Sequence, residues 1–180
     1  MSLLKKILGA FLMLVVLAVG AGFLLPSSVH VERDLLIDAE PADIFALISD
    51  FNAWDAWSPW SQLDPDAIMQ VTGQGLNQTM TWSSENPQVG QGSQVIVSLA
   101  APNLLKTHLD FGSQGMADAT FNLVSEDGKT RVVWSLDTDM REGLPLWQQP
   151  ISTYFGFAMD AMLGPEYETG LQNLKGLVES

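Results

Sequence analysis

The chain contains no cysteine, and this absence excludes disulfide bonds, thiolate metal ligands and cysteine nucleophiles. Its only histidines are His30 and His108, so zinc chemistry and a serine–histidine triad are not expected. Basic residues are also scarce, since 8 Lys and Arg stand against 21 Asp and Glu and give a formal net charge of -13. Phosphate binding requires a basic patch. We therefore expect no metal, no cofactor and no nucleic-acid partner.

Charge is missing altogether from residues 7–25, which carry no charged or polar side chain. A helix rises about 1.5 Å per residue, so this run would nearly span the hydrocarbon core of a bilayer, which is about 30 Å thick. The apolar part of a cleavable signal peptide is shorter, about 7–15 residues. We predict a transmembrane signal anchor over residues 1–26. A cleaved signal peptide and a buried core helix are the alternatives.

The charges around this run predict the orientation of the chain. Lys5 and Lys6 precede it, and the positive-inside rule keeps them in the cytoplasm. The domain of residues 27–180 then faces the periplasm or the outside of a single-pass inner-membrane protein. It holds 6 basic and 21 acidic residues, a net charge of -15. Anionic headgroups repel such a surface, so we expect the domain to be tethered above the membrane.

Residues 27–180 are enough for a single core, and apolar and polar residues alternate in several short runs. Turn residues separate the runs, and Asp127–Gly128 is the strongest hairpin signal. A helical segment with Pro41 in its first turn follows the first run, and the aromatic-rich residues 51–60 suggest a second short helix or a structured loop. The runs predict seven strands, over residues 29–37, 68–72, 78–84, 93–101, 104–111, 117–125 and 130–138.

Apolar residues recur at steps of three and four from residue 151 to residue 178, which predicts a long C-terminal helix. We expect a kink or a break at Gly164–Pro165, because proline removes a backbone donor and clashes with the preceding turn. The order is strand, two helices, a six-strand antiparallel meander and a long helix, an α+β arrangement.

This order resembles the helix-grip fold of the START/Bet v 1-like superfamily. Residues 33–50, the segment Trp54-Asp-Ala-Trp57-Ser-Pro-Trp60 and residues 163–175 are similar to bacterial SRPBCC proteins of the polyketide cyclase/dehydrase-like family. The resemblance covers residues 29–179. It implies a curved seven-strand antiparallel sheet around the C-terminal helix, with a cavity between them that often holds an apolar ligand. The motifs imply no catalytic residue.

The residues also argue for a cavity, because a curved sheet cannot lie flush on one straight helix and native interiors are close-packed. Strand alternation places Val95 on the inner face of the sheet. It places most of the predicted cavity residues, named below, on the same face. The alternative is that these side chains simply pack together as core. The predicted cavity residues are Trp82, Val97, Leu109, Phe111, Phe121, Trp134, Tyr154, Phe155, Met159 and Met162.

Two further features leave alternatives open. Trp54, Trp57 and Trp60 recur every three residues, and they either form the cavity rim or pin the short helices to the sheet. Arg33 shares a strand face with apolar residues, where it is either ion-paired near the sheet edge or an anion anchor in the cavity. Arg33, Tyr154 and Tyr167 are the plausible polar residues of the inner face.

Three functions fit these features. The first is a membrane-tethered protein that holds a small apolar ligand, such as a lipid, an isoprenoid or a polyketide-like molecule. The second is a cyclase or dehydrase, which would need a polar group at the cavity centre. The third is an envelope protein-interaction module without a ligand, which an exposed apolar patch around residues 54–60 would favour. For binding, we expect an internal void of several hundred cubic ångströms.

Overall fold

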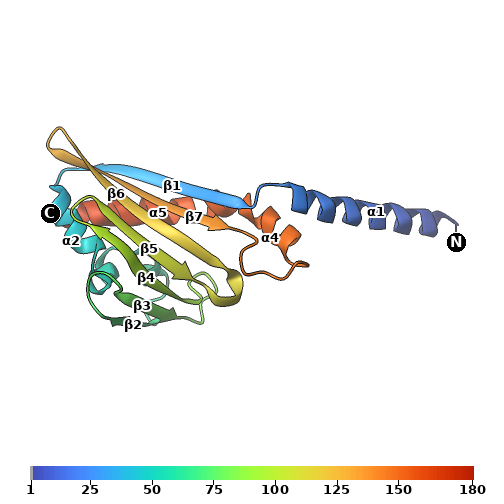
Figure 1. The fold of residues 1–180 in the computed structure, drawn as a ribbon, viewed down its shortest axis with the longest axis horizontal. Coiled ribbons are helices and arrows are strands. Elements are labelled where there is room, and N and C mark those ends of the chain that lie inside the picture. The colour runs from blue at the N-terminus through green and yellow to red at the C-terminus, as the bar shows by residue number, and fades with distance from the viewer. Residues whose placement is uncertain (1) are drawn as a thin grey trace.

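A computed structural model describes residues 2–180 as an α+β fold, with a curved antiparallel sheet packed on a long C-terminal helix (Figure 1). The strands are β1 (Ser28–Ile37), β2 (Ile68–Thr72), β3 (Thr79–Ser83), β4 (Gln91–Ala100), β5 (Leu104–Asp110), β6 (Met116–Glu126) and β7 (Lys129–Asp139). The helices are α1 (Ser2–Leu24), α2 (Pro41–Ile48), η1 (Phe51–Ala56), α3 (Pro59–Leu63), η2 (Gly112–Gln114), α4 (Gln149–Gly156) and α5 (Met159–Val178).

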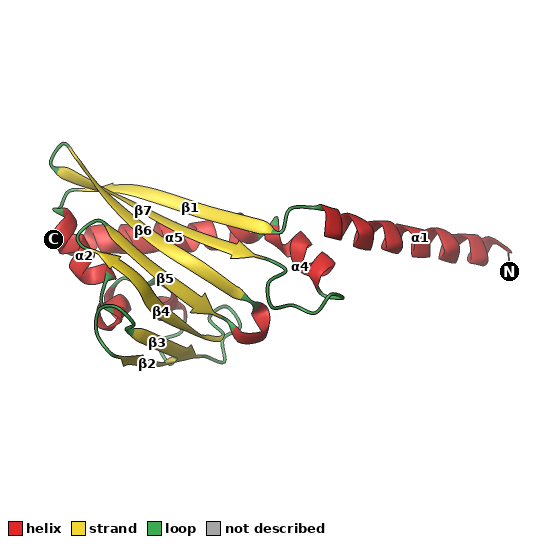
Figure 2. Cartoon of the chain, in the orientation of Figure 1, coloured by secondary structure: helices red, strands yellow, loops and turns green. Residues whose placement is uncertain are grey.

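The seven strands form one sheet in the order β1-β7-β6-β5-β4-β3-β2. Strands β2 to β7 follow one another as a meander, and β1 closes the order by pairing with β7, with Ser28 opposite Asp139. Asp127 and Gly128 both have positive φ at the β6–β7 hairpin, the geometry that an Asp-Gly turn favours. The predicted fold class and the seven strands are confirmed (Figure 2). The predicted helical region between the first two strands is formed by α2, η1 and α3.

Strand β4 departs from simple alternation. Ile96 pairs with Thr107 and Ser98 pairs with Lys106, so Val97 is an extra residue in a β-bulge. Before the bulge Gln94 and Ile96 are buried, and after it Leu99 packs against the core. The prediction that Val95 and Val97 face inward is therefore wrong, and Val97 is 49% exposed on the outer face.

The C-terminal helical region breaks at a different place from the one predicted. The interruption lies at Phe157–Ala158, between α4 and α5, where Phe157 N–H donates to Tyr154 O in a tight final turn. Helix α5 runs on through Pro165. Asp160 and Glu168 lie on either side of this proline, and Arg33 holds both carboxylates. These ion pairs support the helical turns on both sides of Pro165.

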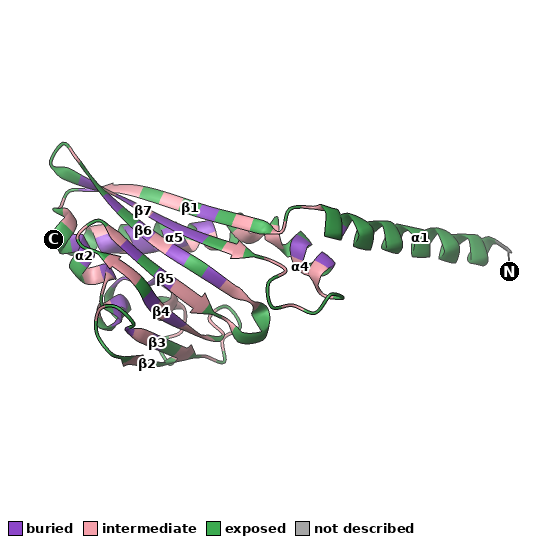
Figure 3. Ribbon diagram, viewed as in Figure 1, coloured by how far each residue is buried: buried purple, intermediate pink, exposed green. Residues whose placement is uncertain are grey.

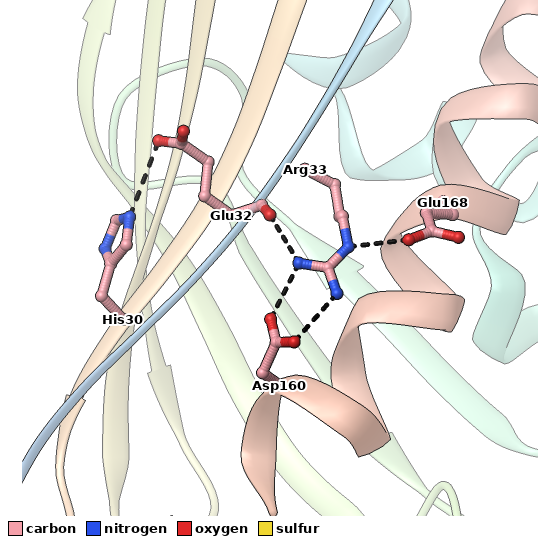
Figure 4. Close-up of polar contacts among 5 residues, drawn as sticks. All are labelled: His30, Glu32, Arg33, Asp160 and Glu168. Atoms are coloured by element: carbon pink, nitrogen blue, oxygen red, sulfur yellow. Dashed lines mark hydrogen bonds and ion pairs between the residues drawn. The ribbon is translucent and has the colours of Figure 1, made fainter. Parts of the chain in front are cut away.

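Arg33 extends from β1 over α5 (Figure 4). Its Nε donates to Glu168 Oε1 at 2.8 Å, and Nη1 and Nη2 donate to the two oxygens of Asp160 at 2.8 and 3.2 Å. A Cβ on Gly164 would lie 1.9 Å from Nη2, so the glycine makes room for the guanidinium. The pKa of Asp160 is lowered because Arg33 donates hydrogen bonds to it. Of the two roles considered for Arg33, the structure therefore shows the ion-paired arginine near the sheet edge and not an anion anchor in the cavity.

Helix α1 projects from the sheet and is exposed over nearly its whole length (Figure 3). Residues Leu3–Leu24 have a mean hydropathy of 2.7 and are long and apolar enough to cross a membrane. Among the described residues, the C-terminal end of α1 packs on α4. Arg141 caps this end, since Nη2 donates to the carbonyls of Gly22 and Leu25 at 2.8 and 2.6 Å. The helix is a candidate membrane span.

Candidate functional site: an apolar pocket between the sheet and the helices

A partly open pocket of about 190 Å³ lies between the sheet, α3 and α5. This is smaller than the several hundred cubic ångströms expected from the sequence. Most of the lining is apolar or aromatic. The lining residues are Trp54, Ser58, Trp60, Ser61, Ala67, Met69, Met80, Trp82, Gln88, Val89, Gln94, Leu109, Phe111, Ala119, Trp134, Leu136, Leu163 and Tyr167.

The pocket lies in the half of the sheet that is nearer to α1. β1 begins next to α1 and lies beside the end of β7. Because neighbouring strands are antiparallel, β5 and β3 also end here, and β6, β4 and β2 begin here. Leu136 is near the end of β7, Leu109 near the end of β5 and Trp82 near the end of β3. Leu163 adds the beginning of α5. The pocket and the candidate membrane span therefore share one end of the molecule.

Aromatic stacking builds the inner wall. Phe121, Trp134 and Tyr167 form a stack from β6 through β7 to α5, with ring centroids 4.7 and 3.8 Å apart. Trp54 and Trp57 meet this stack edge-on. Such geometries stabilise aromatic pairs by about 0.5–1.5 kcal/mol beyond the area they bury. The wall is therefore a rigid surface against which a flat or branched apolar molecule can pack.

The tryptophans are held by hydrogen bonds from their indole nitrogens. Trp54 Nε1 donates to Ile48 O at 2.8 Å and Trp57 Nε1 to Leu47 O at 3.4 Å, so both pin η1 to the end of α2. Trp82 Nε1 donates to Val89 O at 3.2 Å. A Cβ on Gly92 would lie 2.5 Å from the Trp82 ring, so only glycine leaves space for that indole in the pocket wall.

Polar groups in the lining are few, and two of them lack a partner. Within residues 2–180, Trp134 Nε1 and Ser61 Oγ are buried side-chain atoms without a hydrogen bond. An unsatisfied buried donor costs about 1–3 kcal/mol. Gln94, by contrast, is satisfied, since its Nε2 donates to Thr107 Oγ1 at 2.7 Å. Trp134 is thus a lining residue whose buried indole N–H has no hydrogen-bond partner in the protein.

The described lining contains no Asp, Glu, His, Lys or Arg. Tyr167 is its one titratable group, and burial raises the pKa of the phenol above its ordinary value. The hydroxyl therefore stays protonated at neutral pH and is no general base. This lining suits the binding of a neutral molecule better than acid–base chemistry.

The structure brings together some of the predicted cavity residues and separates others. Trp82, Leu109, Phe111 and Trp134 line the pocket. Phe121 is fully buried at the β6 end of the aromatic stack and does not line the pocket, and Met159 is half-buried against the core.

Four of the predicted cavity residues lie elsewhere. The bulge turns Val97 to the outer face. Tyr154 and Phe155 are exposed, because α4 packs on α1 rather than under the sheet, and Met162 is exposed on the outer side of the first turn of α5. The apolar pattern of these three residues therefore belongs to an outer surface, whereas the sequence predicted that it faces the interior.

The three rim tryptophans divide between the two proposed roles. Trp57 is fully buried and does not line the pocket, so it acts as a pin rather than as a rim residue. Trp54 and Trp60 line the pocket, and Trp54 also pins η1. Because Trp54 and Trp57 are buried, residues 54–60 do not form the exposed apolar patch that would favour a protein-interaction module.

The sequence reading missed Gln94, Ser58 and Ser61. Gln94 was not predicted because the bulge shifts the alternation of inward-facing residues along β4. No turn residue in the sequence marks the position of the bulge. Ser58 precedes Pro59 at the beginning of α3, which is a recognisable helix start. That signal could have placed the two serines beside the neighbouring tryptophans.

On the outer face, Asp137, Asp139 and Glu142 line a shallow acidic groove with Asp118 and His108. Among residues 2–180, no group of three or more His, Asp or Glu side chains has a geometry that could hold a metal ion.

Three solved structures illustrate the shared fold at low sequence identity. A START superfamily protein from Mycobacterium smegmatis is 18% identical, with a TM-score of 0.59 over 84% of this chain and 97% of that one. A norcoclaurine synthase point mutant from Thalictrum, bound to a transition-state analogue, is 13% identical with a TM-score of 0.61, covering 84% and 94%. The Aha1 dimer from Colwellia psychrerythraea is 14% identical with a TM-score of 0.56, covering 84% and 96%.

These neighbours differ in what their names describe, so the shared fold alone does not assign a function. No curated protein shows significant sequence similarity to the chain. The family model described as "Polyketide cyclase / dehydrase and lipid transport" matches residues 28–179, which is nearly the whole of the sheet domain. With a START/Bet v 1-like fold and a match of this length, the chain belongs to the polyketide cyclase/dehydrase and lipid transport family.

Proposed function

We propose that the protein is a membrane-tethered binding protein for a small, mainly apolar molecule that carries at least one hydrogen-bond acceptor. The observation that carries this proposal is an apolar pocket whose lining has no charged side chain but holds an unpartnered indole N–H at Trp134. A carbonyl, ester, ether or hydroxyl oxygen of the ligand would accept from Nε1 after a small movement of the lining, because the nitrogen itself is buried. Burial of the ligand's apolar surface would supply most of the affinity, at about 25 cal/mol per Å².

The size of the pocket limits what it can hold. A cavity of roughly 150 Å³ accommodates a benzene molecule. The pocket of about 190 Å³ therefore suits one ring or a short branched chain. Because the pocket is partly open, the tail of a longer lipid or isoprenoid would extend out of it. The family description, which includes lipid transport, agrees with this ligand class.

Tethering is the second part of the proposal. Helix α1 would span the inner membrane once, with Lys5 and Lys6 in the cytoplasm and residues 27–180 on the periplasmic side. A reporter fused after Ser180 tests this topology, because it should be active only outside the cytoplasm. Activity of the reporter in the cytoplasm would exclude the arrangement.

The binding proposal is tested by extraction of the full-length protein from membranes of its natural host, followed by mass spectrometry of the apolar compounds that co-purify. Ala67→Phe adds a ring to the pocket lining, and Ala100→Phe adds the same ring at an exposed position outside the pocket. We expect a compound enriched with the wild type and with Ala100→Phe but depleted with Ala67→Phe. Equal recovery from all three proteins would exclude this pocket as the binding site.

A further inference from the structure

Large exposed apolar side chains are concentrated in residues 146–162, the segment whose helix α4 packs on α1. They belong to α4, its flanking loops and the first turn of α5, and their exposed fractions lie between 54% and 73%. We name this surface the α4 patch and define it as Leu146, Trp147, Ile151, Phe155, Phe157 and Met162. Single exposed hydrophobic residues are ordinary, whereas a gathered apolar surface marks an interaction site.

Helix α4 is fixed to the last turns of α1. A Cβ on Gly22 would lie 2.6 Å from Pro150 Cβ, so the two backbones pack closely there. Tyr154 Oη donates to the carbonyl of Ala18 at 2.6 Å. Arg141 Nε donates to Thr153 Oγ1, while its Nη2 caps α1. These contacts hold the α4 patch at the level of residues 18–25 of α1.

The charge pattern of this region differs from that of the remaining surface. Residues 143–159 contain no charged side chain, in a domain with 21 acidic and 6 basic residues. The repulsion by anionic headgroups that we expect for the acidic surface is therefore absent here. Trp147 and Tyr154 are residue types enriched at membrane–water interfaces, where an apolar ring and a polar group are both satisfied.

We propose that the α4 patch inserts into the lipid leaflet in which α1 ends. This inference rests on the proposed membrane tether, because lipid that surrounds α1 at Ala18 is in reach of a helix bonded to Ala18. The occupant is the bilayer, since the patch continues the apolar surface of α1 and the two charges beside it are held by partners, Arg141 by carbonyls at the end of α1 and Asp160 by Arg33. The domain is then seated on the membrane through one mainly apolar corner, and its acidic surface faces water.

Seating the domain in this way has a consequence for the pocket. Met162 of the α4 patch adjoins Leu163, which lines the pocket, and both belong to the beginning of α5. The pocket also lies in the half of the sheet that is nearer to α1. Insertion of the patch therefore brings the pocket to the membrane surface, where an apolar ligand is most concentrated.

The absence of cysteine makes a direct test possible with single-cysteine variants of the full chain. Ile151→Cys and Phe155→Cys report on the patch and Leu14→Cys on the middle of α1. Val97→Cys and Val124→Cys are matched controls, because these apolar residues are about half exposed on the outer face of the sheet. Each variant is labelled with an environment-sensitive fluorophore and reconstituted into vesicles of equal parts phosphatidylcholine and phosphatidylglycerol. Brominated acyl chains then quench labels in lipid, and aqueous iodide quenches labels in water.

We expect bromolipid quenching at residues 14, 151 and 155 and iodide quenching at residues 97 and 124. If residue 14 is quenched by bromolipid but residues 151 and 155 by iodide, α4 lies in water; the inference is then wrong while the tether stands. If residue 14 is not quenched by bromolipid, the tether itself fails. If residues 151 and 155 are shielded from both quenchers, a second copy of the chain covers the patch, which also overturns the inference.

Discussion

The indole ring of Trp134 on β7 lies flat on the phenol ring of Tyr167 on α5, with centroids 3.8 Å apart and planes 10° apart. The contact joins the sheet to the long helix at the inner wall of the pocket. It also fixes the indole while its Nε1–H remains without a partner.

Trp134→Phe keeps an aromatic ring on Tyr167 and removes the free donor. We expect the empty protein to change little in stability, because the lost desolvation penalty of about 1–3 kcal/mol offsets the loss of packed surface. Wild-type protein should bind acetophenone, which has a carbonyl acceptor, up to about tenfold more tightly than ethylbenzene. The variant should bind both probes equally. Ligand-observed NMR in nanodiscs measures this ratio, with empty nanodiscs as the background, and a preserved preference would contradict the role of Nε1.

Gly164→Ala tests whether the close packing of the Arg33 guanidinium on α5 requires glycine at this position. The new methyl group would meet the guanidinium and displace it from Asp160 and Glu168, so we expect a lower melting temperature. Gly176→Ala in the same helix is the matched control, since open space surrounds that position. Alanine should stabilise the helix there by up to about 1 kcal/mol. The melting temperatures of the two variants should therefore move in opposite directions, and equal shifts would show that Arg33 is not constrained by Gly164.

Gly22→Leu tests the packing of α1 on α4. The leucine side chain would overlap Pro150 and force the helices apart, whereas Gly20→Leu adds the same side chain where no atom lies within 4 Å. Both changes keep α1 apolar. Spin labels on Leu14→Cys and Val124→Cys should give a broadened distance distribution in the Gly22→Leu background alone. A narrow distribution in both backgrounds would mean that α4 does not position α1.

The raised pKa of His30 makes the stability of the fold depend on pH. Its pKa is raised from 6.5, first because Asp137 hydrogen-bonds to it, with Nδ1 2.7 Å from Oδ1, and further because of the charges of Asp137 and Glu32. The folded state thus favours the protonated ring. The pair contributes its full stability below pH 6.5, and the contribution is lost as the pH rises through the raised pKa.

NMR titration of the full chain checks this effect. Asp137→Asn should lower the titration midpoint of His30 toward its ordinary value, because the hydrogen-bonded carboxylate is gone. Glu85→Gln removes the same charge at an exposed, distant position and should leave the midpoint where it is. Equal midpoints in both variants would assign the raised pKa to the overall negative charge instead.

The sequence predicts the sheet well because alternation and turn residues are local signals. Asp127–Gly128 marks the β6–β7 hairpin, and alternation places Leu109 and Trp134 on the inner face. It fails at Val97, because a bulge has no turn residue to announce it. It fails again at Phe155, since helical periodicity identifies an apolar face without saying what covers that face. The ion pairs of Arg33 across Gly164 depend on contacts between residues far apart in the chain, which no local pattern contains.

The bulge in β4 also governs how much room lies beneath the sheet. An extra residue at Val97 bends the strand, and the part before it carries Gln94 over the pocket while the part after it carries Leu99 to the core. Without that surplus residue Ser98 would follow Ile96 in regular alternation, still on the outer face opposite Lys106, and the strand would straighten. A shortening of the chain by a single amino acid here would therefore flatten the sheet above the chamber while the same side chains continue to line it.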